Sequence, residues 1–139
     1  MEFRKTTLLS VYTGEDVMCN DIPLYKSIVA EARRLGLAGA TVFKGIEGYA
    51  AKVRGIGRAI NTFISGNANL PIIINIVDER KNIEKILPFL EVHADHALVM
   101  VEDVTILMTD YTRKREAERL LKQQHEHCGP RQQQSQQQQ

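Results

Sequence analysis

Hydrophobic positions follow two periods along the chain and together predict six core elements. Runs of apolar and β-branched residues, which are typical of strands, occupy 6–13, 40–44, 70–77 and 98–109. Between the first two runs, and again between the last two, apolar residues recur at the spacing of a helix face: Leu24, Ile28, Ala32 and Leu35, then Ile83, Ile86, Leu87 and Leu90. The order βαββαβ predicts an α+β, ferredoxin-like sandwich, an antiparallel sheet with two helices on one face.

Local signals place the ends of these elements. We expect the first helix to begin at Pro23 behind Asp21 as a cap, and to end at Gly36 in the position after the C-cap. Pro88 interrupts the second helical pattern, and we expect a kink or a break there because proline removes a backbone hydrogen bond. Acidic pairs at 78–79 and 102–103 are interpreted as a helix start and as a bulge or edge in the last strand. The type of the apolar stretch 59–65 stays open, and 66–69 is interpreted as a turn.

The C-terminal part of the chain differs in composition from the predicted core. Residues 112–128 are mostly charged, with a small apolar patch at Ala117, Leu120 and Leu121, which predicts a largely solvated helix ended by Gly129 and Pro130. Residues 132–139 are seven glutamines and one serine, typical of a disordered, low-complexity tail. We therefore divide the chain into a core domain at 1–110, a helical extension at 111–130 and a tail at 131–139.

Composition and charge exclude several broad classes. The 139 residues carry 18 Lys and Arg against 17 Asp and Glu, so a general nucleic-acid binder is not expected. No apolar run approaches the roughly 20 residues that cross a bilayer, and we expect no membrane insertion. Cys19 and Cys128 have no motif spacing, which favours reduced thiols and a cytoplasmic location.

Glycine and positive charge gather in one stretch. Seven of the nine glycines lie in 36–66, and residues 44–58 have a local charge of +3 from Lys44, Lys52, Arg54 and Arg58 against Glu47. Successive backbone N–H groups at Gly45 and Gly48 can form an anion-binding nest, and an arginine can bind a phosphate with two hydrogen bonds. The alternative is a mobile hairpin whose charges only keep it in water.

Several motifs in combination resemble a known family. These are residues 12–15, 23–25, 70–71 and 76–78 with the segment 36–49 (GLAGATVFKGIEGY); over about 6–110 they resemble the PII-like family called domain of unknown function 190. The resemblance implies a ferredoxin-like homotrimer related to the nitrogen-regulatory PII proteins. It also implies a sensor of a small molecule, an adenine nucleotide, with no catalysis of its own and no required cofactor.

The resemblance also implies a ligand site in the clefts between subunits, walled by the end of the second strand and the base of a long loop, the T-loop. The ligand-binding residues we expect are Glu15, Gly39, Thr41, Lys44, Gly45, Gly48, Tyr49, Arg54, Arg58 and His96. Most of the cationic triphosphate clamp of PII is missing, because 94–97 lacks the lysine and the last strand offers Thr105 and Leu107 in place of arginines. A nucleotide with fewer phosphates, or another anion, is therefore favoured over ATP. The 45–66 loop is expected to regulate a partner protein, with a membrane transporter as one candidate.

Individual residues keep alternative interpretations. Tyr49 can stack on a base or contact a partner, or it can anchor the loop. Glu15 can hydrogen-bond a ribose or pair with a loop arginine, or it can be a plain turn carboxylate.

Two further functions stay open. His93 and His96 suggest a metal-ion-responsive trimer of the copper-tolerance type, and His125, His127 and Cys128 form a second cluster. Because metal sites need three or four convergent ligands, ordinary surface histidines are the favoured interpretation and no metal site is predicted. No Ser-His-Asp or Cys-His arrangement is present in the sequence, so an enzyme is not expected; a small phosphate or acyl-phosphate hydrolase of this fold class is the remaining alternative.

Overall fold

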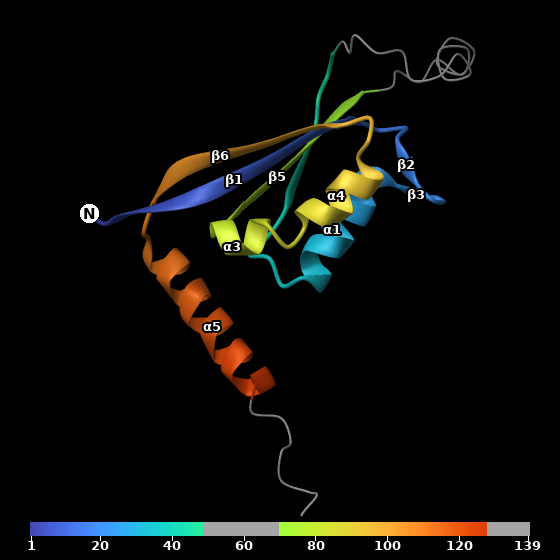
Figure 1. Cartoon of the computed structure of the whole chain (residues 1–139). Helices are drawn as coiled ribbons and strands as arrows, with labels where there is room; N and C mark the ends of the chain where they lie inside the picture. The colour runs from blue at the N-terminus through green and yellow to red at the C-terminus, as the bar shows by residue number, and fades with distance from the viewer. Residues whose placement is uncertain (49–69, 128–139) are drawn as a thin grey trace, which may run out of the picture. The chain divides into compact units, whose positions relative to one another are not determined.

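The computed structural model describes residues 1–48 and 70–127. The chain divides into two compact units, one formed by Lys5–Val104 and the other by Met1–Arg4 with Thr105–Gln139. The strands and helices in chain order (Figure 1) are β1 (Phe3–Gly14), β2 (Met18–Cys19), β3 (Ile22–Pro23), α1 (Leu24–Arg34), β4 (Thr41–Lys44), β5 (Pro71–Asp78), α3 (Arg80–Ile83), α4 (Leu87–His93), β6 (Leu98–Leu107) and α5 (Asp110–His127).

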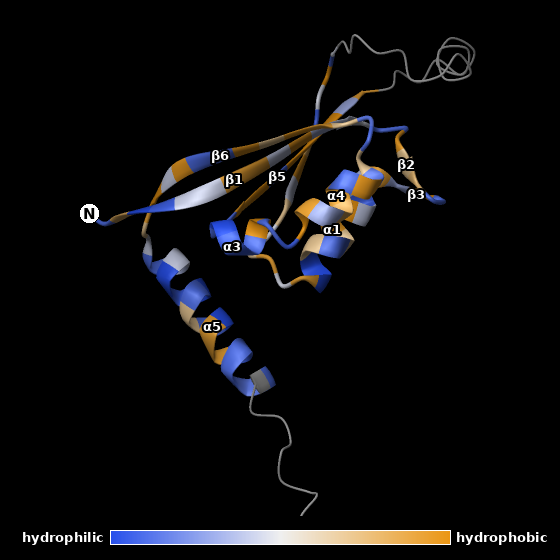
Figure 2. Cartoon of the chain, in the orientation of Figure 1, coloured by the Kyte–Doolittle hydropathy of each residue, from blue (hydrophilic) through white to orange (hydrophobic). Residues whose placement is uncertain are grey.

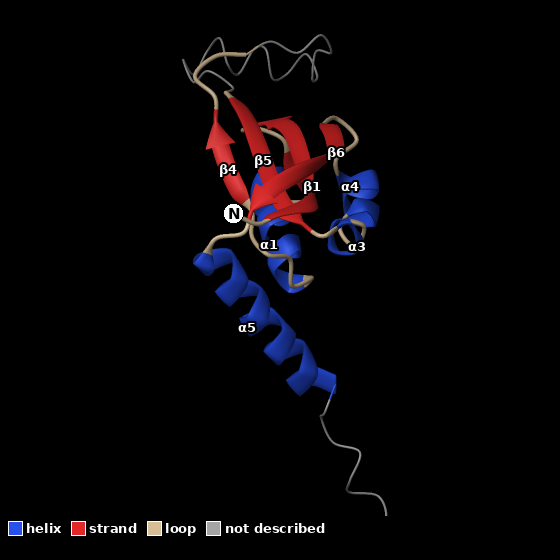
Figure 3. Ribbon diagram, turned by 90° about the vertical axis from the view of Figure 1, so that its left-hand side faces the viewer, coloured by secondary structure: helices blue, strands red, loops and turns tan. Residues whose placement is uncertain are grey.

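The main sheet has the strand order that the split βαβ arrangement requires. Its order is β4-β5-β1-β6, and both β1 and β4 pair with β5 in antiparallel fashion. Figure 3 shows α1, α3 and α4 on one side of this sheet. The predicted ferredoxin-like α+β fold is confirmed, and β6, which carries the acidic pair 102–103, is an edge strand as one of the two interpretations required.

A small hairpin between β1 and α1 was not predicted. Met18 pairs with Pro23 and Cys19 with Ile22, and the turn contains Asn20 at φ 55°, a backbone conformation that asparagine tolerates better than most residues. The two strands are only two residues long, too short to show a period in the sequence.

The core lies between the helices and one face of the sheet. Neighbours in register on this face, such as Leu9 with Ile76 and Val11 with Ile74, are fully buried. The helix α1 contributes the stripe that the spacing predicted: Leu24, Ile28 and Ala32 are buried. Burial of such side chains stabilises a fold by about 1.5–3 kcal/mol each, so this layer is the main source of stability.

The ends of α1 agree with the prediction at one end and differ at the other. Gly36 has φ +72° and its N–H donates to the carbonyl of Arg33, while the N–H of Leu37 donates to that of Ala32. This pair of bonds is the Schellman motif, so the predicted glycine cap is confirmed. The predicted cap at Asp21 is wrong, because the N-cap residue is Pro23 and no side chain caps the helix.

The second helix is broken, as Pro88 predicted. It divides into α3 and α4, with Pro88 in the first turn of α4, where the missing N–H of proline has no helical partner to lose.

Asp78 does more than begin this helical region. Its buried carboxylate accepts hydrogen bonds from the backbone N–H of Ala38 (2.8 Å) and of Glu79 (2.7 Å) and from the side-chain amide of Asn82 (2.9 Å). One carboxylate therefore joins the α1–β4 connection to the end of β5 and to α3.

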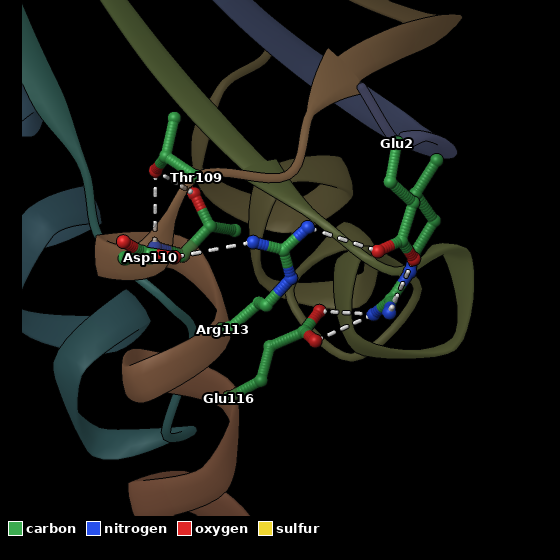
Figure 4. A network of polar contacts seen from close by, with 7 residues as sticks. Glu2, Thr109, Asp110, Arg113 and Glu116 are labelled. Atoms are coloured by element: carbon green, nitrogen blue, oxygen red, sulfur yellow. Dashed lines mark hydrogen bonds and ion pairs between the residues drawn. The ribbon is translucent and has the colours of Figure 1, made fainter.

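The second unit joins the N-terminal residues to α5 through charged side chains (Figure 4). The Arg4 guanidinium donates to both carboxylate oxygens of Glu116, at 2.6 and 2.5 Å. Arg113 contacts Glu2 at 3.1 Å and Asp110 at 3.3 Å.

The helix α5 confirms the predicted C-terminal helix over its described length. It begins two residues earlier than predicted, next to Thr109, whose hydroxyl accepts from the N–H of Thr112 at 3.2 Å. Within the described ranges, no helix combines the length and apolarity needed to span a bilayer. The predictions for 59–69 and for the chain beyond 127 lie outside the described residues.

Candidate functional site

Three strand ends meet at one end of the sheet, next to the predicted regulatory loop. The backbone N–H of Glu15, just after β1, donates to the carbonyl of Leu70 at 3.0 Å. The N–H of Gly45, just after β4, donates to the carbonyl of Pro71 at 2.8 Å. We call the residues gathered here the loop base: Glu15, Lys44, Gly45, Gly48 and Pro71.

The two glycines of the loop base pack against the ring of Pro71. A Cβ atom at Gly45 would lie 2.5 Å from Cγ of Pro71, and one at Gly48 would lie 2.9 Å from the same atom. Both distances are shorter than carbon atoms tolerate, so the close approach requires glycine. Since the N–H of Gly45 already has an acceptor in Pro71, packing is a sufficient reason for this glycine.

An ion pair crosses the loop base. Lys44 Nζ lies 2.7 Å from Glu15 Oε1, and the side chains are 54% and 37% exposed. β5 lies between the two strands that carry them, which places those strands about 9–10 Å apart. Both side chains must therefore extend toward each other over the start of β5. Glu15 thus pairs with a lysine, where a loop arginine was one of the predicted partners.

The other predicted ligand residues do not join this cluster. Gly39 and Thr41 lie at the opposite end of β4, where Thr41 is exposed and in register with Asn75. His96 is exposed in the connection before β6, at the other edge of the sheet. Tyr49, Arg54 and Arg58 lie outside the described residues.

The histidines form no visible metal centre in the described ranges. His96 Nε2 lies 3.5 Å from Asp95 Oδ2, and the ring of His93 packs against Phe89 with centroids 4.6 Å apart. No group of three His, Cys, Asp or Glu residues that could hold a metal occurs in 1–48 and 70–127. The predicted cluster near the C-terminus includes Cys128, which is not described.

Shifted ionisation is found on α1 rather than at the loop base. The hydrogen bond from the Arg34 guanidinium lowers the pKa of the Glu31 carboxyl, and the same contact raises the pKa of Arg34. These residues are three apart on one helix, so the pair is interpreted as a local helix contact.

One face of the sheet was missed in the sequence analysis. On the side away from the helices, Tyr12, Ile73 and Phe43 lie in one cross-strand row, and Tyr12 and Phe43 are 40% and 50% exposed. Met100 of β6 is 37% exposed, and Figure 2 shows apolar residues along these strands. The near-continuous apolar run of β5 was the available signal, because such a run is typical of a strand covered on both faces.

Comparisons with known proteins agree with this architecture. The family DUF190, described as an uncharacterized ACR, matches residues 6–106. A UPF0166 protein of Aquifex aeolicus is 33% identical over 77% of this chain and 98% of its own length. A second UPF0166 protein, of Methanocaldococcus jannaschii, is 38% identical over 71% of this chain and 89% of its own.

A solved structure supports the fold. A protein from Thermus thermophilus, assigned as PII-like and signalling, matches with a TM-score of 0.52 at 18% identity, covering 77% of this chain and 94% of that one. The expected family and fold are therefore confirmed: this chain belongs to the DUF190 family and has the fold of PII-like proteins.

Proposed function

We propose that this protein is a PII-like regulatory protein and not an enzyme: a homotrimer that binds a small anionic effector, an adenine nucleotide, in the clefts between subunits. Binding at the loop base then alters the 45–66 loop, which engages or releases a partner protein. The observation that carries the proposal is the convergence of Glu15 and Lys44, with two tightly packed glycines, at the foot of that loop. Ligand contacts that order a loop are an established switching route.

The position of His96 favours a cleft between two copies. In the sheet order, β4 with Lys44 forms one edge and β6, which follows His96, forms the other. Three strand spacings, about 14 Å, therefore separate these edges. Figure 1 shows β6 starting at the end of the sheet where β1 ends. A ligand that touches Lys44 and His96 together is then best placed between the β4 edge of one copy and the β6 edge of another.

The open face of the sheet supports the proposed trimer. Contiguous exposed apolar residues on a small domain mark a surface that another molecule covers, and Tyr12 and Phe43 lie side by side across β5 on this face. A second and third copy, each burying the same face, would cover it in a closed ring.

Light scattering on the purified chain tests the trimer. We expect three times the chain mass of 15.7 kDa, and we expect Phe43→Lys to lower the mass because it places a charge in the covered face. Val92→Lys is the matched control, since Val92 is 71% exposed on α4, in the helical layer. A wild-type mass of one chain would contradict the trimer and the inter-subunit site.

Calorimetric titration tests the effector. AMP, ADP, ATP and cyclic nucleotides are titrated into the wild-type protein, and we expect heat with at least one of them, favouring those with fewer phosphates. The absence of both heat and a thermal shift with all of them would overturn the nucleotide proposal while leaving the trimer standing.

A further inference from the structure

The Glu15–Lys44 ion pair holds together two groups that a ligand of the loop base would have to meet. The two residues follow different strands, and their side chains meet over the start of a third. Both remain partly exposed, and exposed ion pairs contribute only about 0–1 kcal/mol because water competes and two long side chains lose freedom. A ligand that satisfies both groups can therefore replace the pair at little cost.

The carboxylate of the pair selects against simple anions. An ionised Glu15 only accepts hydrogen bonds, so an inorganic anion bound to Lys44 would leave two negative charges facing each other. A ligand with an anionic group for Lys44 and neighbouring hydroxyl donors for Glu15 satisfies both. Among small metabolites, a ribose diol and its phosphate offer this combination.

We infer that the loop base selects ribonucleoside phosphates over free anions, with Glu15 binding the ribose hydroxyls and Lys44 the phosphate, in place of their ion pair. This inference rests on the proposed function and specifies its ligand chemistry. The exchange also acts where regulation needs it: Lys44 immediately precedes Gly45, whose backbone is held against Pro71, so a moved Lys44 pulls directly on the foot of the loop.

Titration calorimetry with three probes tests the inference on the full chain: AMP, 2′,3′-dideoxy-AMP and inorganic phosphate. Because hydrogen bonds to a charged group are stronger than neutral ones, we expect wild type to bind AMP at least about ten-fold more tightly than the dideoxy compound. We expect no measurable binding of phosphate.

The variant Glu15→Gln removes the negative charge and keeps the size of the side chain. We expect the preference for AMP over dideoxy-AMP to fall to within about three-fold, and phosphate to become a detectable ligand. Glu47→Gln is the matched control, because it makes the same change of charge at an exposed neighbour and should keep the wild-type preference.

The outcomes separate the two levels of the proposal. Equal wild-type affinity for AMP and dideoxy-AMP, or an unchanged preference in Glu15→Gln, overturns the role of Glu15 while nucleotide binding stands. Binding of phosphate alone to wild type overturns the selectivity. Failure of AMP itself to bind overturns the selected ligand, and silence with the other adenine nucleotides as well would overturn the proposed function.

Discussion

Replacing Asp78 should reveal how much stability depends on a single buried carboxylate. In Asp78→Asn the remaining oxygen can still accept from Glu79 and Asn82, but the new NH₂ group faces the N–H of Ala38, which the carboxylate meets at 2.8 Å. A donor left without an acceptor costs about 1–3 kcal/mol. Asp78→Ala removes all three acceptor contacts and should cost about 3–5 kcal/mol.

Urea denaturation measures both variants at one fixed protein concentration, since association adds to apparent stability. With a slope of about 1–3 kcal/mol per molar urea, we expect the midpoint of Asp78→Asn to fall by about 1 M. Asp95→Asn is the control, because Asp95 is an exposed carboxylate, and its midpoint should stay close to wild type. The reasoning would be refuted by an Asp78→Asn midpoint equal to wild type, or by Asp78→Ala being no less stable than Asp78→Asn.

Two further predictions concern the loop base and α5. Gly45→Ala should lower stability by about 1–3 kcal/mol because its Cβ meets the rigid ring of Pro71, whereas a Cβ at Gly39 meets no atom within 4 Å and Gly39→Ala should change the melting temperature little; equal melting temperatures would contradict the packing role. Glu116→Lys should lower helical circular dichroism by opposing Arg4, and adding Arg4→Glu should restore it; a double variant no better than the single one would show that this pair does not hold α5.

The sequence pattern predicted those parts of the fold that depend on periodicity over many residues. The α1 stripe of Leu24, Ile28 and Ala32, the β5 run and the cap at Gly36 follow from local spacing and local backbone preference, and all three are present. The β2–β3 hairpin has two residues in each strand, too few for a period to appear. Asp21 has the residue type of a cap, but the hairpin carries the chain into α1 through Pro23 instead.

The candidate site was predictable only in part, because its geometry depends on contacts distant in sequence. The pattern placed Glu15, Lys44 and the glycines in one region of interest, but it gave no sign that Pro71 lies against Gly45 and Gly48. The pairing of Glu15 with Lys44 likewise follows from the order in which the strands lie, not from spacing along the chain. The sequence could not distinguish a glycine that binds a ligand from one that makes room for a ring.

The charge network around α5 has a consequence for how relatives of this protein vary. Glu2 and Arg4 precede the residues that the family shares, and Arg113 and Glu116 follow them. The alignment with the Aquifex aeolicus protein takes up 98% of that protein but only 77% of this chain, which leaves that relative little length for a matching helix. Relatives without such a helix have no partner for charges at positions 2 and 4. We therefore expect those two positions to drift freely in short relatives and to covary with 113 and 116 in long ones, so that a comparison of sequences alone would show which relatives have the extension attached in this way.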